Sequence, residues 1–156
     1  MRGSDAMNYS TDCPSIKDQV TAEEWQARCA LAACYRLVDK YGMTDLIYNH
    51  ITARVPGEED ALLINLYGLL YKEITASSLV KIHVDGEILS KPDTDYDINK
   101  SGYVIHGAIH KARPDVACVL HTHTRAGMAV AAMQCGLLPL SQTAIRFFGH
   151  IGYHDY

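Results

Sequence analysis

Two histidines at the end of a short apolar run have the types and spacing to bind a metal. His121 and His123 follow residues 116–120, an apolar segment whose start is marked by Arg113-Pro114-Asp115. Such a run, bounded by a proline, predicts a buried strand. Side chains two positions apart in a strand point to the same face, so both imidazoles are expected to aim at one spot, with Thr122 facing away. Neutral imidazole is the commonest nitrogen ligand of zinc and related divalent ions. The pair therefore predicts half of a metal site.

The alternative is that these histidines are ordinary polar residues at the end of a strand. The surrounding strand is apolar, and a helix rich in small residues is expected directly afterwards, over residues 125–134. Ligand pockets tend to form at such strand-to-helix turns. This context favours the metal hypothesis over the polar-surface one.

A second pair of histidines is expected on a helix. His106 and His110 are four residues apart in a segment, 101–113, with helical character, so they share one face. The segment reads His-Gly-Ala-Ile-His and lacks the glutamate of the metalloprotease motif, which excludes that class of enzyme. Two roles stay open for His106, namely direct ligation, or packing and support behind the ligands. We favour packing and support.

The elements that must position these side chains can be read from hydrophobic periodicity. Thr21 and Glu24 predict a capping box that begins a helix over residues 22–40, and Gly42 ends it. Short separations between the early strand-like segments predict a mostly antiparallel sheet, with Asp85-Gly86 as a hairpin turn. The segments with strand character are 47–54, 61–66, 80–84, 87–89, 116–123 and 137–143.

Composition describes an ordinary globular protein. The chain has 156 residues, 48% hydrophobic and 21% charged, which predicts a lead-in over residues 1–20 and one domain over residues 21–156. A formal net charge of −4 argues against nucleic-acid binding. The sequence shows no apolar run long enough to span a membrane, and we expect no signal peptide. Five cysteines without a CxxC pair predict a reduced, cytoplasmic protein.

Four passages, taken in order, carry a family resemblance. They are Asn49-His-Ile-Thr-Ala-Arg54, residues 63–71, residues 106–115 and Ala117-Cys-Val-Leu-His-Thr-His-Thr124. Together they resemble the class II aldolase/adducin family, over what would be the N-terminal part of a typical member. The resemblance implies a three-layer α/β/α fold around a mostly antiparallel sheet. It also implies a homo-oligomer, often a tetramer with sites between subunits.

The same resemblance implies a particular site. His121 and His123 would be two of three metal-binding histidines, with zinc as the usual metal and iron or manganese also compatible. The metal would polarise the hydroxy-carbonyl end of a sugar phosphate and steady the enediolate formed by retro-aldol cleavage. The phosphate-binding loops of the family would correspond to the regions of Asn49, Gly68 and Ser101.

Two departures from the family pattern bear on activity. The third metal histidine of the family would come downstream of this chain, and neither His150 nor His154 matches it, so the chain is expected to be truncated or its site incomplete. The acid/base glutamate of the aldolases aligns with Gly102, and residues 100–106 look closer to the adducin-like branch. A positioned acid/base contributes about 10²–10⁴-fold to a rate, so its loss matters.

Two functional hypotheses follow. The first is a metal-dependent lyase acting on a small hydroxy-carbonyl compound or sugar phosphate, or a relative whose metal chemistry has drifted to dehydration, decarboxylation or iron-dependent oxidation. The second is a non-catalytic, adducin-like module for self-assembly and protein partners. We favour the first, because a scaffold has no need for the converging imidazoles of His121 and His123.

Overall fold

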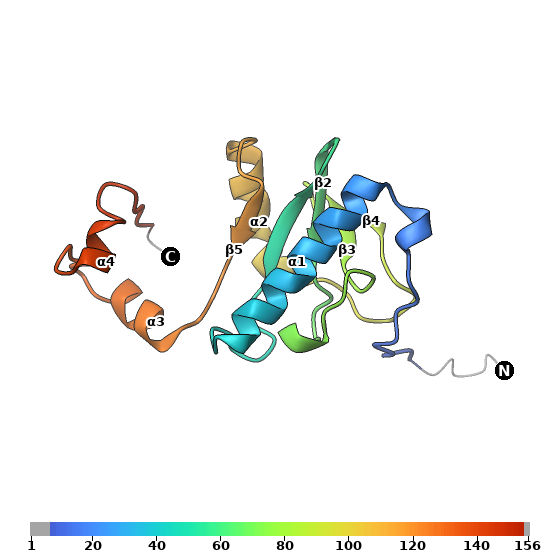
Figure 1. Cartoon of the computed structure of the whole chain (residues 1–156), viewed down its shortest axis with the longest axis horizontal. Coiled ribbons are helices and arrows are strands. Elements are labelled where there is room, and N and C mark those ends of the chain that lie inside the picture. Colours follow the sequence, from blue (N-terminus) through green and yellow to red (C-terminus); the bar gives the residue numbers. More distant parts are fainter. Residues whose placement is uncertain (1–6, 155–156) are drawn as a thin grey trace. The chain divides into compact units, whose positions relative to one another are not determined.

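The protein, described here by a computed structural model over residues 7–154, divides into two compact units. The first unit runs through Thr122 and the second begins at His123 (Figure 1). In the described part of the chain, every strand and the two longest helices belong to the first unit.

The first unit is built on a five-stranded sheet with the order β4-β3-β2-β1-β5. Every neighbouring pair of these strands is antiparallel, as the sequence predicted. Gly86 (φ +94°) turns the chain between β3 and β4 in a backbone conformation that favours glycine. The strands are β1 (Ile51–Val55), β2 (Glu58–Ile64), β3 (Val80–His83), β4 (Ile88–Ser90) and β5 (Cys118–Leu120).

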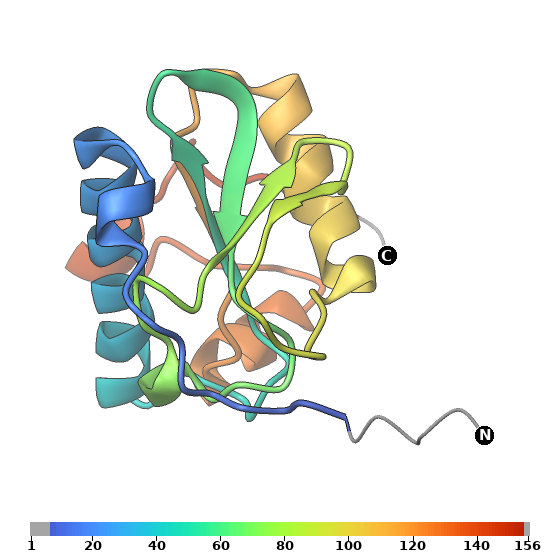
Figure 2. The ribbon, with the colours of Figure 1, turned by 90° about the vertical axis from the view of Figure 1, so that its right-hand side faces the viewer.

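Two helices cover opposite faces of this sheet and complete the predicted three-layer α/β/α arrangement (Figure 2). Helix α1 (Ala22–Lys40) packs on β1 and on the short 3-10 helix η2 (Tyr71–Glu73), and α2 (Lys100–Ala112) packs on β5. A second 3-10 helix, η1 (Lys17–Gln19), precedes α1. Among the residues described, no helix combines the length and apolar character needed to cross a bilayer.

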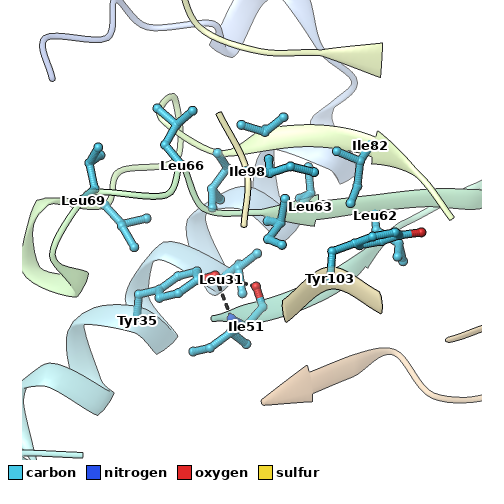
Figure 3. Packing of buried hydrophobic residues seen from close by; sticks show 14 of the residues in the cluster. Leu31, Tyr35, Ile51, Leu62, Leu63, Leu66, Leu69, Ile82, Ile98 and Tyr103 are labelled. Atoms are coloured by element: carbon cyan, nitrogen blue, oxygen red, sulfur yellow. Dashed lines mark hydrogen bonds between the residues drawn. The ribbon is translucent and has the colours of Figure 1, made fainter. Parts of the chain in front are cut away.

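The core lies mainly between α1 and the middle of the sheet. Leu62, Leu63 and Ile64 are consecutive on β2 and completely buried, because β2 is a central strand covered on both faces. Tyr35 of α1 is also completely buried, and its hydroxyl lies 2.5 Å from the Ile51 carbonyl and 2.8 Å from the Ile51 amide (Figure 3). This contact fixes α1 to the residue where β1 begins.

Only one of the two hydrogen bonds of the predicted capping box is present at the N-terminus of α1. Thr21 Oγ1 accepts a hydrogen bond from the Glu24 amide at 3.1 Å. The Glu24 carboxylate was expected to return to the Thr21 backbone, and this half of the capping box is wrong. The carboxylate instead bonds Arg28 Nε at 2.8 Å and Lys81 Nζ at 3.0 Å. A buried carboxylate is far more stable beside two cations than beside one amide, and these pairs also join α1 to β3.

The strands that flank the histidines are shorter than predicted. β1 begins at Ile51 instead of residue 47, because the chain turns just before it: the Tyr48 amide bonds the Asp45 carbonyl at 3.0 Å, and Leu46 has φ +48°. β5 ends at Leu120, although the His121 amide still bonds the His50 carbonyl at 3.3 Å. The pairing of β5 with β1 therefore reaches the first of the two predicted metal histidines.

The second unit is helical and irregular within the residues described. The predicted helix after the histidines is present as α3 (Arg125–Ala131). The predicted strand over residues 137–143 is wrong. Pro139 removes a backbone donor from that run, and Ser141 Oγ accepts from the Ala144 amide at 3.1 Å to begin the short helix α4 (Gln142–Ile145).

Candidate functional site

Four histidines gather beside β1, α2 and the end of β5 in the first unit. His50 comes directly before β1, His106 and His110 lie on α2, and His121 directly follows β5. The first three are at most 3% exposed. The ring centroid of His50 lies 4.0 Å from that of His106 and 5.7 Å from that of His121. The fold thus brings to one place histidines that are far apart in the sequence.

Thr52 organises the two histidines of α2. Its hydroxyl lies 2.9 Å from Nδ1 of His106 and 2.9 Å from Nε2 of His110. A hydroxyl carries one proton, so it donates to one neutral ring and accepts from the other. These contacts agree with the packing role favoured for His106, because its Nδ1 is already hydrogen-bonded to the Thr52 hydroxyl on β1.

The environment favours the neutral forms of His50, His106 and His110. Burial, reinforced by the neighbouring histidines His50, His121 and His110, lowers the pKa of His106 to about 3. Burial also lowers the pKa of His50, with His121 adding to the effect, and that of His110, with Arg54 adding to it. Neutral imidazoles can accept hydrogen bonds or bind metal, which protonated ones cannot.

His50 packs against the start of α2 at Gly102. Nε2 of His50 donates to the Gly102 carbonyl at 2.8 Å, while Nδ1 is buried and has no hydrogen-bond partner. A Cβ at position 102 would lie only 2.9 Å from Nδ1 and 3.0 Å from Nε2 of this ring. A side chain at position 102, which the family resemblance aligns with the acid/base glutamate of the aldolases, would therefore meet the imidazole of His50. Sequence reasoning missed His50, although it stands in the 49–54 passage that carries the resemblance.

The predicted substrate-binding residues have different surroundings. Asn49 is buried; its Oδ1 accepts from the Asp45 amide at 2.6 Å, and its Nδ2 is buried without a partner. Ser101 is exposed in the first turn of α2 and donates to Oδ1 of Asn99 at 2.8 Å. Asn49 and Ser101 belong to the same region. Asn49 directly precedes His50, Ser101 directly precedes Gly102, and His50 and Gly102 are hydrogen-bonded to each other.

Gly68, the remaining predicted substrate-binding residue, packs against an aromatic ring. Its φ is +112°, and a Cβ there would lie 2.7 Å from the ring of Tyr96. Both the backbone conformation and the close ring require glycine at this position. Tyr96 in turn contacts the ring of Tyr9, with centroids 5.0 Å apart, so the N-terminal segment supports this loop.

Comparison with known proteins identifies the family. The profile of the Class II Aldolase and Adducin N-terminal domain matches residues 29–156. The chain belongs to this family. Among related sequences, alpha-adducin of Rattus norvegicus is 47% identical over 156 residues, which cover 100% of this chain and 20% of alpha-adducin.

Solved structures of family members share the fold. An aldolase II superfamily protein from Pseudomonas syringae is 54% identical, with a TM-score of 0.87 over 91% of this chain and 57% of the other. L-fuculose 1-phosphate aldolase from Glaciozyma antarctica PI12 is 28% identical, with a TM-score of 0.78 over 89% of this chain and 56% of the other. The chain spans about half the length of its bacterial relatives.

Class II aldolases typically depend on a divalent metal, and the chain fits that requirement in part. His121 belongs to the first unit and His123 begins the second, so the convergence of their rings stays a prediction. Within residues 7–154, no three side chains of the His, Cys, Asp and Glu types gather as a metal centre. A catalytic zinc usually takes three protein ligands. The predicted pair thus falls one ligand short of a complete site.

Proposed function

We propose that the chain carries part of the active site of a metal-dependent lyase that cleaves a sugar phosphate or another small hydroxy-carbonyl compound. One observation carries this proposal: two buried polar atoms, Asn49 Nδ2 and His50 Nδ1, lack protein partners in the region next to His121. Buried polar groups are nearly always hydrogen-bonded, and an exception calls for an explanation, of which a binding or catalytic role is one. A polar ligand would satisfy both atoms.

The residues take the following roles in this proposal. His121 and His123 hold the metal, for which zinc is favoured and iron or manganese also suitable, with a third ligand from outside the described residues. When bound, the metal polarises the substrate carbonyl. Asn49 Nδ2 donates to the phosphate, and the first turn of α2 at Ser101 offers the partial positive charge of a helix N-terminus to the same group. Gly68, with its positive φ, gives a second loop the tight turn that we assign to phosphate binding.

One relative supports a narrower substrate class for this proposal. The Glaciozyma antarctica enzyme is named for L-fuculose 1-phosphate, a ketose phosphorylated on the carbon next to its carbonyl. We take a 1-phosphorylated ketose as the substrate class. Its retro-aldol cleavage would release dihydroxyacetone phosphate.

The test is the double substitution His121→Ala/His123→Ala. We expect it to abolish binding of Zn²⁺, measured by elemental analysis after dialysis, and to leave the circular dichroism spectrum unchanged, because both residues lie outside the strands and helices. The matched control is His150→Ala/His154→Ala, which removes two exposed histidines of the second unit and should leave the metal content as it was. Unchanged metal stoichiometry in the first variant would show that the wrong residues were chosen.

A second candidate function is an adducin-like assembly module without catalysis. The 47% identity to alpha-adducin favours it, and so does Gly102, which stands where the aldolases carry their acid/base. Drifted metal chemistry, such as dehydration, decarboxylation or iron-dependent oxidation, is a further option within the enzyme class. A protein that binds no metal, and whose stability is unaffected by chelation, would favour the assembly module.

The proposal also covers assembly and location. We propose a cytoplasmic homo-oligomer, a tetramer by analogy with the family. The exposed apolar side chains Val104 and Ile105 on α2, at 66% and 57% exposure, support self-association. Measurement of the mass in solution by light scattering would test this, and a monomer at all concentrations would contradict it.

A further inference from the structure

His50 has a buried ring nitrogen that packing leaves without a hydrogen-bond partner. Its ring is 3% exposed, and its two nitrogens are in very different situations. Nε2 donates to the Gly102 carbonyl, because a carbonyl can only accept. Nδ1 of the neutral ring then carries a lone pair, and that atom is buried without a partner. Leaving a buried acceptor unpaired has an energetic cost, which a bound ligand would remove.

The place of this ring is also specific. The His50 imidazole fills the volume that a side chain at position 102 would need, since a Cβ there would lie 2.9 Å from Nδ1. On one side the ring packs against the tilted ring of His106, whose Nδ1 is held by Thr52. On another side its neighbour is His121, which the proposed function assigns to the metal. The ring is therefore held by its neighbours and by the Gly102 carbonyl, and Nδ1 is the one ring nitrogen left without a hydrogen-bond partner.

From these contacts we infer that His50 is a substrate-contacting residue, whose Nδ1 accepts a hydrogen bond from a hydroxyl of the bound compound. This inference rests on the proposed function and extends it by one residue. A ketose phosphate and its three-carbon fragment both carry hydroxyls beside the carbonyl, and such a hydroxyl is the donor that a lone pair at Nδ1 selects. In this chain, the residue that contacts the reacting end of the substrate is thus His50. In a family aldolase, the residue aligned with position 102 would make that contact.

Two substitutions of His50 distinguish the roles of its two ring nitrogens. In His50→Asn the side-chain amide coincides with the position of Nδ1, so an acceptor is kept and the bond to Gly102 is lost. In His50→Gln the amide reaches the position of Nε2, so the bond to Gly102 is kept and the acceptor is lost. The probe is dihydroxyacetone phosphate, titrated by calorimetry into the Zn²⁺-loaded protein, with metal content measured separately.

The inference predicts that His50→Gln weakens the binding of dihydroxyacetone phosphate about tenfold, the effect of one lost hydrogen bond. His50→Asn should stay within about threefold of the unchanged protein, and both variants should keep their metal. If His50→Gln binds as tightly as the unchanged protein, the inference is wrong while the proposed function stands. If both variants lose Zn²⁺, His50 is a metal ligand and the inference is again wrong. If the unchanged, metal-loaded protein does not bind the probe, the proposed substrate class fails and the inference fails with it.

A third variant tests the same idea without touching His50. Gly102→Ala introduces a Cβ against the imidazole, while alanine is the better helix former by about 1 kcal/mol. We expect the ring to be displaced and the affinity for dihydroxyacetone phosphate to fall about tenfold in a helix that is otherwise intact. This variant decides the question if the His50 variants do not fold. Unchanged affinity in Gly102→Ala would contradict the inference.

Discussion

At the scale of single residues, one hydroxyl supports the whole group of buried histidines. Thr52 is completely buried on β1 and bonds His106 and His110 at the same time. The ring of His106 in turn packs against that of His50. The position of the candidate site therefore depends on a side chain that does not belong to it.

This dependence gives a prediction for Thr52→Val, which keeps the shape of the side chain and removes its hydroxyl. Two buried ring nitrogens would lose their partner, and each unsatisfied polar group costs about 1–3 kcal/mol. We expect the free energy of unfolding, measured by urea denaturation, to fall by about 2 kcal/mol or more. Thr52→Ser keeps the hydroxyl and is the matched control, with a smaller loss. Equal stability of the valine variant would mean that both histidines find other partners.

At the scale of elements, α1 is fastened to the first residue of β1. Tyr35 and Ile51 exchange hydrogen bonds, and the Tyr35 hydroxyl also lies 2.9 Å from Asn65 Oδ1. Tyr35→Phe leaves a buried amide and carbonyl without this partner. We expect a loss of about 1–3 kcal/mol in the free energy of unfolding, with faster hydrogen exchange at the Ile51 amide.

The matched control lies just after the same helix. Tyr41 is 69% exposed, so Tyr41→Phe should change the free energy of unfolding by less than about 0.5 kcal/mol. If Tyr35→Phe is as mild as Tyr41→Phe, the contact between α1 and β1 does not depend on the hydroxyl.

The elements also show what a sequence can and cannot predict. Helix α1 was predicted correctly from residue 22 to residue 40, because a cap and a 3.6-residue period are local features. The strand over residues 137–143 was wrong, because an extended run becomes a strand only when a partner strand lies beside it. The role proposed for His50 was missed for the same reason. Its decisive neighbour, Gly102, is 52 residues away in the sequence, and no local pattern connects the two.

At the scale of the whole molecule, the buried histidines connect the candidate site to folding. The first unit holds His50, His106 and His110 in their neutral forms, and each has its pKa lowered by burial. An unfolded chain would expose them to water and let them take up protons at the ordinary value of 6.5. The arrangement that keeps the imidazoles able to bind a ligand thus makes the fold sensitive to acid.

The sign and range of this effect follow from proton linkage. Between pH 6.5 and about pH 3, the value for His106 in the folded protein, the unfolded state binds more protons, so the free energy of unfolding decreases as the pH falls. From pH 7.5 to pH 5, His106 alone should account for a loss of about 2 kcal/mol. Urea denaturation of the metal-free protein at the two pH values measures the total loss. His106→Gln removes this titration, so its stability should change less between the two values, whatever its stability at pH 7.5. An equally steep decrease in His106→Gln would show that His106 is not protonated on unfolding, and that other groups, such as the carboxylates, cause the acid sensitivity.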